Sequence, residues 1–259
     1  MQFDLISDLH VETWGDRQVN WEGLGTSLIA VVAGDISQDL DEVYSTVLDI
    51  SKNYKHVVYL DGNHEHRNQD NINQRREEIA EKFDKYRNIT YLYRNTIVLD
   101  STAFIGCNGW YSFDFGEPYI TKQECWHWLM DHGRDQELLI EQWQMAMEDA
   151  EYLSNAVQHC SMDNTIKDIV LVTHTVPNRK LAWFPDSHIP IETMSMQGNS
   201  FLENVLMHDT MSKVKIWAFG HLHHTHDQMI DGIRYVSNPR GSPEDKLSQA
   251  IYYPKFIKS

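Results

Sequence analysis

The chain has 259 residues, 41% of them hydrophobic and 23% charged, and its formal net charge is −16. This acidity excludes a general grip on the backbone of long nucleic acids, which requires a basic stripe. No apolar run approaches the ~20 residues that cross a bilayer, and the N-terminus lacks the pattern of a signal peptide, so we expect no membrane association.

The first part of the chain alternates short apolar runs with helical patterns. We expect strands at residues 3–7, 28–33 and 57–60 and helices at residues 39–53 and 71–86, with a loop at 11–25. The run at 28–33 is almost continuously apolar, which is typical of a strand that is buried on both faces.

The middle of the chain is less regular. Three short pieces at residues 89–92, 96–99 and 102–105 are spaced like an antiparallel meander. An aromatic-rich insert follows at about residues 107–135, where we expect a long loop. The insert is either a cap whose rings stack on a nucleobase or a small separate core beneath the loop.

The last part of the chain returns to strands and helices. We expect helices at 137–158 and 200–208, a loop at 176–198, and strands at 169–173, 214–219, 229–230, 233–236 and 250–253. Asp231-Gly232 is a hairpin turn signal. Without a repeat or a linker, we predict a single domain of residues 1–259, an α/β fold of two sheets with helices outside.

Five polar clusters stand among these elements, most of them directly after a predicted strand. They are Asp8-Leu9-His10, Gly34-Asp35, Gly62-Asn63-His64-Glu65, His174 and Gly220-His221-Leu222-His223. Open α/β sheets place their sites at the carboxyl ends of strands. If the backbone stays extended there, the two outer residues of an Asp-x-His or His-x-His cluster point the same way.

The clusters hold enough ligands for two cations that share one carboxylate. They supply two carboxylates, one amide and four imidazoles, namely Asp8, His10, Asp35, Asn63, His174, His221 and His223. Oxygen and nitrogen ligands without thiolate suit Mn²⁺, which we expect first, and also Fe, Zn, Ni or Co. Two cations ~3.5–4 Å apart can acidify a shared water and clamp a phosphoryl group. Each cluster alone is weak evidence, and the inference depends on their joint occurrence.

Together the five clusters resemble the full signature of the calcineurin-like metallophosphoesterases, over roughly residues 3–241. The resemblance implies a four-layer α/β/β/α sandwich and a metal-bridging hydroxide as nucleophile. One metal would be held by Asp8, His10, Asp35 and His223. The other would be held by Asp35, Asn63, His174 and His221. His64 would not be a ligand; it would be catalytic, by stabilising the transition state or protonating the leaving oxygen.

The chain departs from the phosphoprotein phosphatases of that family. Gln38 stands where those enzymes have an Asp that orients the catalytic histidine, and no phosphate-binding Arg follows it. His64 therefore lacks that carboxylate unless Asp39 provides it, which disfavours protein dephosphorylation. The segments 110–114 and 238–241 are similar instead to small bacterial and phage phosphohydrolases.

We therefore expect a metal-dependent phosphoesterase for a small soluble phosphoester, with a diester slightly favoured over a monoester and a nucleotide among the candidate substrates. One alternative is a nuclease for single-stranded nucleic acid, which the acidity disfavours. Another is a non-catalytic scaffold that binds a partner, which the intact ligand set and His64 disfavour. Three scattered cysteines without a Cys-x-x-Cys pair favour the reducing cytoplasm. The sequence leaves the oligomeric state open.

Several residues near these clusters have open roles. His66 and Arg67 either contact a phosphate or have a plain surface role. Arg240 binds either a phosphate or a backbone carbonyl. His224 and His226 match no family position, and we expect them to be structural or to support a ligand.

Overall fold

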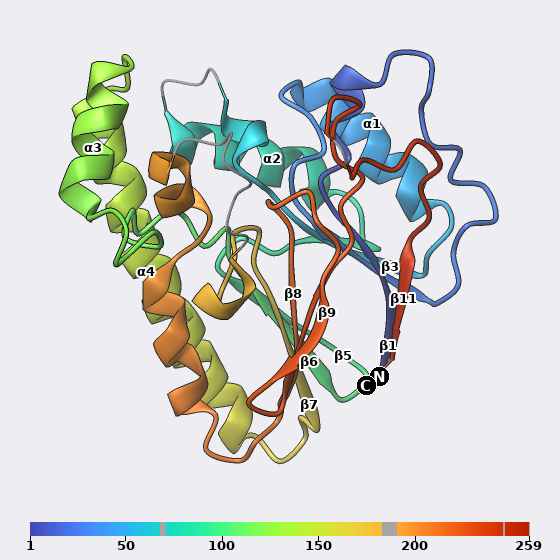
Figure 1. The fold of residues 1–259 in the computed structure, drawn as a ribbon. Helices are drawn as coiled ribbons and strands as arrows, with labels where there is room; N and C mark the ends of the chain where they lie inside the picture. Colours follow the sequence, from blue (N-terminus) through green and yellow to red (C-terminus); the bar gives the residue numbers. More distant parts are fainter. Residues whose placement is uncertain (68–70, 183–190, 246, 259) are drawn as a thin grey trace.

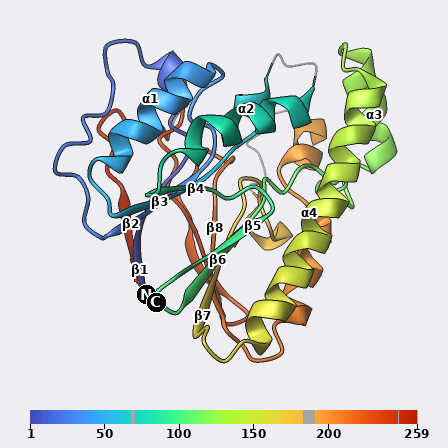
Figure 2. The same cartoon turned by 180° about the vertical axis from the view of Figure 1, so that it is seen from behind.

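The computed structural model describes residues 1–67, 71–182, 191–245 and 247–258. In this part of the chain two mixed sheets face each other, and helices cover their outer faces (Figure 1). The reverse view shows α1 and α2 over one sheet and the long α4 along the other (Figure 2). The predicted α/β/β/α sandwich is confirmed.

The first sheet has the strand order β11-β1-β2-β3-β4. Strands β1 to β4 run parallel, and β11 pairs antiparallel with β1. The bounds are Gln2–Ile6 (β1), Ile29–Ala33 (β2), His56–Leu60 (β3), Ile89–Tyr91 (β4) and Lys255–Lys258 (β11). The apolar run predicted as a buried strand forms β2, the middle strand of this sheet. It is buried on both faces as predicted, because its side chains alternate toward the two layers beside the sheet.

The second sheet has the strand order β5-β6-β7-β8-β10-β9, with parallel inner strands and antiparallel edges. The bounds are Asn95–Leu99 (β5), Thr102–Gly106 (β6), Asp168–Val172 (β7), Val214–Phe219 (β8), Asp227–Ile230 (β9) and Ile233–Ser237 (β10). The β9–β10 hairpin turns at Asp231 and Gly232, whose φ values of 50° and 85° match the positive φ that a tight hairpin turn requires.

The helices are α1 (Leu40–Ser51), α2 (Ile72–Asp84), α3 (Lys122–Asp131) and α4 (Gln136–Met162), with short 3₁₀ turns between elements. Residues 200–208 are 3₁₀ rather than α-helical, and the expected loop at 176–198 contains further 3₁₀ turns, apart from residues 183–190, which lie outside the described part. Among the described residues, no helix combines the length and apolarity needed to cross a bilayer.

The predicted antiparallel meander at residues 89–105 is wrong, although each of its three strands exists. Leu92 donates its N–H to the carbonyl of Tyr59 at 2.7 Å, which extends the parallel pairing of β4 with β3. Arg94 then adopts φ of 40°, and the chain crosses to the other sheet. Only β5 and β6 form an antiparallel hairpin, because the turn after β4 redirects the chain between layers.

Two further predictions are corrected near the insert and the C-terminus. Residues 107–135 are not a loop throughout, because α3 begins at a capping box in which Thr121 and Glu124 bond each other's backbone N–H. The rings of Trp110 and Phe113 pack into a separate buried cluster beneath α3 and α4. Residues 250–253 form no strand; the last strand is β11, which pairs with β1 instead.

Candidate metal centre

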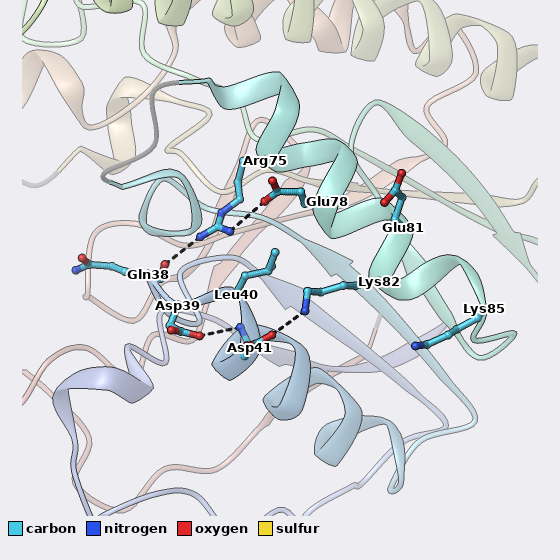
Figure 3. A pocket seen from close by; sticks show the side chains of 9 residues that line it. All are labelled: Gln38, Asp39, Leu40, Asp41, Arg75, Glu78, Glu81, Lys82 and Lys85. Atoms are coloured by element: carbon cyan, nitrogen blue, oxygen red, sulfur yellow. Dashed lines mark hydrogen bonds and ion pairs between the residues drawn. The ribbon is translucent and has the colours of Figure 1, made fainter.

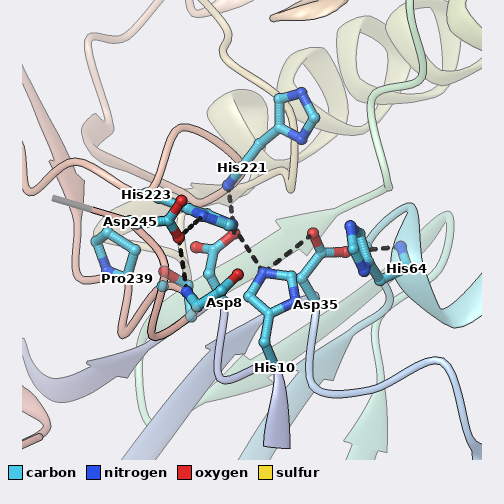
Figure 4. A network of polar contacts seen from close by, with 12 residues as sticks. Asp8, His10, Asp35, His64, His221, His223, Pro239 and Asp245 are labelled. Carbon is cyan, nitrogen blue, oxygen red and sulfur yellow. Dashed lines mark hydrogen bonds and ion pairs between the residues drawn. The ribbon is translucent and has the colours of Figure 1, made fainter. Parts of the chain in front are cut away.

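Three groups of side chains in the described part of the chain lie close enough to hold a metal ion; one is His10, Glu12 and His64, and the other two share a carboxylate. Of these two, the first group is Asp8, His10, Asp35 and His223, and the second is Asp35, His174 and His221. Within each group, one potential ligand atom per residue lies within 4.8 Å of the others. Figure 4 shows the side chains of the first group converging. Asp35 belongs to both groups, as a bridging carboxylate would.

Asn63 lies beside the second group. Its Oδ1 is 3.0 Å from Nε2 of His174 and 2.9 Å from Nδ1 of His221. The amide therefore faces the same point as the two imidazoles. All seven residues that the sequence singled out as ligands are thus brought together at the carboxyl ends of the strands.

The backbone that presents these residues is not extended, so that expectation is wrong. Strand β1 already ends at Ile6, before its two ligands. Five of the potential ligands have left-handed φ values: Asp8 (49°), His10 (43°), Asp35 (54°), His221 (75°) and His223 (47°). Such φ values are uncommon for non-glycine residues and cost free energy that the surroundings must offset. Strain concentrated on five potential ligands is typical of a functional site.

Three glycines let these turns approach one another. A Cβ on Gly62 would lie 2.1 Å from Oδ1 of Asp35, and one on Gly34 would lie 2.6 Å from both the Gly62 nitrogen and Nδ1 of His174. A Cβ on Gly220 would lie 2.8 Å from Oδ2 of Asp8. The glycines of the polar clusters therefore serve close packing of the ligand turns.

Hydrogen bonds orient three of the imidazoles. His174 contacts the Ala33 carbonyl through Nδ1 at 2.9 Å, and His223 contacts the Asp245 carboxylate through Nδ1 at 2.6 Å (Figure 4). His221 contacts the Met196 carbonyl through Nε2 at 3.0 Å. Since carbonyls and carboxylates only accept, these nitrogens carry the protons and the opposite ring nitrogens face the site.

The donor set fits a cation because the site's own groups leave negative charge and lone pairs unmatched. Oδ2 of Asp8 is buried without a hydrogen-bond partner. The Nε2 atoms of His10 and His223 face each other at 2.7 Å, which requires either a proton or a cation between two lone pairs. A buried carboxylate without compensation is costly, and metal coordination is one way to offset that cost.

The pKa shifts of the site residues also indicate a site for positive charge. Burial opposes ionisation of Asp35, but the imidazoles led by His174 hold its pKa well below the usual range. Burial likewise opposes a charged His174, yet Asp35 raises the pKa of His174 to about 10. His221, buried and next to His174, has its pKa lowered to about 3. The buried Asp35 carboxylate thus requires positive charge beside it, which a protonated His174 supplies when no metal is bound.

His64 lies at the edge of these groups, with Glu12 beside it. Oε1 of Glu12 is 3.9 Å from Nδ1 of His64 and 3.9 Å from Nδ1 of His10. Neither Glu12 oxygen accepts a hydrogen bond in the described structure. Sequence reasoning missed Glu12, although its place two residues after His10 was a usable signal.

Asp39 is not the carboxylate that serves His64. It is the N-cap of α1, and its Oδ1 accepts a hydrogen bond from the N–H group of Asp41 (Figure 3) and another from that of Glu42. The surface hollow between α1 and α2 in that figure contains paired charges, with Lys82 on Asp41 and Arg75 on Glu78.

Glu65 holds the turns together rather than facing the ligands. Its buried carboxylate accepts from the N–H groups of Asp35 (3.1 Å), Ile36 (2.9 Å) and Gly62 (2.9 Å). The turns after β2 and β3 are therefore bonded to one side chain. This role was not anticipated from the sequence.

The residues with open roles are also placed. His66 is buried, with Nε2 2.6 Å from Oδ2 of Asp61. Arg240 is buried with its guanidinium over the Trp14 ring, 3.9 Å from the centroid, and donates to the backbone carbonyl of Arg17. The structure thus contains the carbonyl contact of Arg240, while its Nε and Nη1 atoms have no hydrogen-bond partner among the described residues. His226 is buried with its ring against Phe219.

Comparison with known proteins assigns this architecture to a family. Residues 1–225 match the family model described as calcineurin-like phosphoesterase. An uncharacterized protein of Acanthamoeba polyphaga mimivirus is 24% identical over 233 residues, covering 82% of this chain and 78% of that protein.

A solved structure shares the fold. Phosphopantetheinyl hydrolase from Mycobacterium tuberculosis superposes with a TM-score of 0.73 at 18% identity, over 93% of this chain and 90% of that one. A putative 5′-nucleotidase from Staphylococcus aureus has a TM-score of 0.47 at 13% identity, over 93% of this chain and 48% of that one.

Proposed function

The chain belongs to the calcineurin-like phosphoesterase family and is a metal-dependent hydrolase of phosphoric esters; from this premise we propose that it acts on a small soluble phosphoester, a diester in preference to a monoester. The observation that carries the proposal is the pair of candidate metal groups that share Asp35, with His64 at their edge. The free cysteines Cys107, Cys125 and Cys160 fit a cytoplasmic enzyme.

Two divalent cations, Mn²⁺ first and Fe, Zn, Ni or Co otherwise, would be held by the seven clustered residues. One set is Asp8, His10, Asp35 and His223. The other is Asp35, Asn63, His174 and His221. When bound, the metals supply an acidified water and the positive charge that a phosphoryl group needs.

His64 would deliver the proton that the leaving oxygen requires. It is 22% exposed, so a substrate can reach it. In the metal-free protein burial by itself lowers the pKa of His64, but Asp35 and Glu12 raise it above the ordinary value. Imidazole is suited to proton transfer near neutral pH. Glu12 would orient the ring, in place of the carboxylate that Gln38 and Asp39 do not provide.

A cavity of about 720 Å³ adjoins this point and gives room for an organic leaving group. Its lining includes Asn63, His64 and His221, so the cavity opens beside the second metal group. This space supports an ester with a bulky substituent.

The first test is hydrolysis of an aryl phosphomonoester and a bis-aryl phosphodiester with added Mn²⁺, with chelator as control. We expect metal-dependent hydrolysis of both, faster for the diester. Asp35→Ala or His64→Ala should lower kcat by a factor of about 100 or more, because the first removes the carboxylate that both metals would share and the second removes the proton donor. His159→Ala, an exposed histidine on α4, is the matched control and should retain activity.

Full activity in Asp35→Ala or His64→Ala, with the fold checked by circular dichroism, would contradict the proposal. Metal-independent hydrolysis would do the same. Degradation of single-stranded oligonucleotides at physiological salt would favour the nuclease alternative. Metal binding without hydrolysis of any ester would favour the partner-binding scaffold.

A further inference from the structure

The cavity beside His64 has walls of two kinds. Ile72, Leu129, Leu138, Leu139 and Met196 supply apolar surface, and the rings of Trp110 and Tyr111 complete it. Leu129 and Leu139 are each 2% exposed and belong to the buried cluster under α3 and α4, so this wall is held in place by packing. An apolar body of nucleoside size fits such a wall.

Two arginines line the same cavity and have no partner among the residues that the structure describes. Arg67 and Arg134 are exposed, and neither guanidinium has an ion pair or a hydrogen bond to any described residue. Elsewhere in the described chain many arginines are paired or stacked, for example Arg94 with Asp149 and Arg234 with Asp227. Two unpaired guanidinium groups at one cavity, on a chain of net charge −16, create a local site for an anion.

Polar atoms in the lining also lack partners. Nε1 of Trp110 and Nδ1 of His66 are buried without a hydrogen bond, and the two rings touch edge to face with centroids 5.5 Å apart. Because Nε2 of His66 donates to the Asp61 carboxylate, Nδ1 is left as an acceptor, while the indole N–H is a donor. Gln142 adds an amide to the lining. The two ring nitrogens lie behind the cavity surface, so Gln142 is the group of these that can exchange hydrogen bonds with a ligand.

Resting on the proposed function, we propose that this cavity binds the leaving group of the substrate and that this leaving group combines an apolar body with a second anionic group. The ester phosphorus would lie at the metal groups and the body against the Leu129–Leu139 wall. The second anion would contact Arg67 and Arg134. The phosphoester would therefore carry negative charge at both ends.

The insert after β6 builds most of this subsite. Trp110, Tyr111, Leu129 and Arg134 come from residues 107–135, and Leu138, Leu139 and Gln142 come from the start of α4. Arg67 comes instead from the turn that carries His64. Most of the leaving-group subsite thus comes from a segment separate from the ligand turns, and Arg67 is the exception.

The test uses three aryl phosphates with Mn²⁺: phenyl phosphate, 2-naphthyl phosphate and 2-naphthyl phosphate with a 6-sulfonate, or the corresponding methyl diesters if diesters are preferred. We expect kcat/KM to rise from phenyl to naphthyl through apolar burial. The kcat/KM for the sulfonated naphthyl ester should be roughly tenfold higher than that for the neutral naphthyl ester, because the sulfonate accepts charge-assisted hydrogen bonds. Without a local cation, the acidic protein would disfavour the sulfonate.

The variants are Arg67→Gln and Arg134→Gln, and the readout is the ratio of kcat/KM for the sulfonated ester to that for the neutral naphthyl ester. We expect each variant to lower the ratio about tenfold, mainly through KM. Arg87→Gln, which removes an exposed arginine outside the cavity, should keep the wild-type ratio.

A wild-type ratio of one or less would overturn this inference. So would a ratio in Arg67→Gln and Arg134→Gln that is as high as the ratio in Arg87→Gln. Metal-dependent hydrolysis of phenyl phosphate in the same experiment would show that the proposed function stands while the subsite fails. Loss of hydrolysis for all three esters would instead count against the proposed function.

Discussion

At the scale of the residue, a single buried carboxylate organises the ligand turns. Glu65 is 1% exposed and accepts hydrogen bonds from three backbone N–H groups. These groups follow β2 and β3 and take no part in the strand pairing of the sheet. Removing an acceptor leaves buried donors unsatisfied, which costs about 1–3 kcal/mol for each donor. Glu65 therefore contributes to stability and to the position of Asp35 at once.

We predict that Glu65→Ala lowers the free energy of unfolding by about 3 kcal/mol or more, and Glu65→Gln by less because one oxygen remains. Urea unfolding in chelator measures this without a contribution from metal binding. The matched control is Glu81→Ala, an exposed glutamate on α2, for which about 0.5 kcal/mol or less is expected. Equal losses in Glu65→Ala and Glu81→Ala would refute the role of Glu65.

At the scale of the element, the helix that follows β2 begins with a cap rather than with a catalytic acid. The Asp39 carboxylate accepts from two N–H groups of the first turn of α1, which would otherwise lack acceptors. The Asp39 carboxylate is therefore engaged in capping α1 at the surface and does not serve His64. Its position next to Gln38 in the sequence had suggested the catalytic role.

We predict that Asp39→Ala lowers the free energy of unfolding by about 1 kcal/mol and leaves kcat unchanged. Asp39→Ser, which keeps a capping oxygen, should restore most of the stability. Thermal unfolding and steady-state kinetics on the same preparations check both parts. A fall in kcat comparable to that of His64→Ala would mean that Asp39 supports the histidine after all.

At the scale of the whole molecule, the candidate metal centre connects the two sheets. Asp8, Asp35 and Asn63 follow strands of the first sheet, whereas His174 and His221 follow strands of the second. A cation between them would bond both halves of the sandwich in the folded state only. Binding of this kind stabilises a protein by mass action.

We predict that Mn²⁺ at about 100 times its Kd raises the free energy of unfolding of the chelator-stripped protein by about 2.7 kcal/mol. For a chain of this size the corresponding rise in Tm is roughly 5–10 °C. Differential scanning calorimetry with and without Mn²⁺ measures it. Asp35→Asn, which removes the charge shared by both metal groups, should lose most of the rise in Tm. An equal rise in that variant would contradict the prediction.

Much of the architecture could be predicted from the chain alone, because it depends on local patterns. The apolar runs of β2, β3, β7 and β8 mark buried strands, and the polar clusters after them mark the edge where side chains meet. Residue type at these ends is enough to indicate metal chemistry, since carboxylates and imidazoles are metal ligands wherever the fold collects them.

Only the tertiary structure decided how those residues meet and what supports them. The left-handed φ values of Asp8 and His221 arise from bonds between turns that are far apart in sequence, so periodicity along one strand could not predict them. Glu12 and Glu65 acquire their roles from neighbours on other strands. The crossing from β4 to β5 and the cavity under α3 depend likewise on packing between layers, because a sheet's partners and a cavity's walls come from separate parts of the chain.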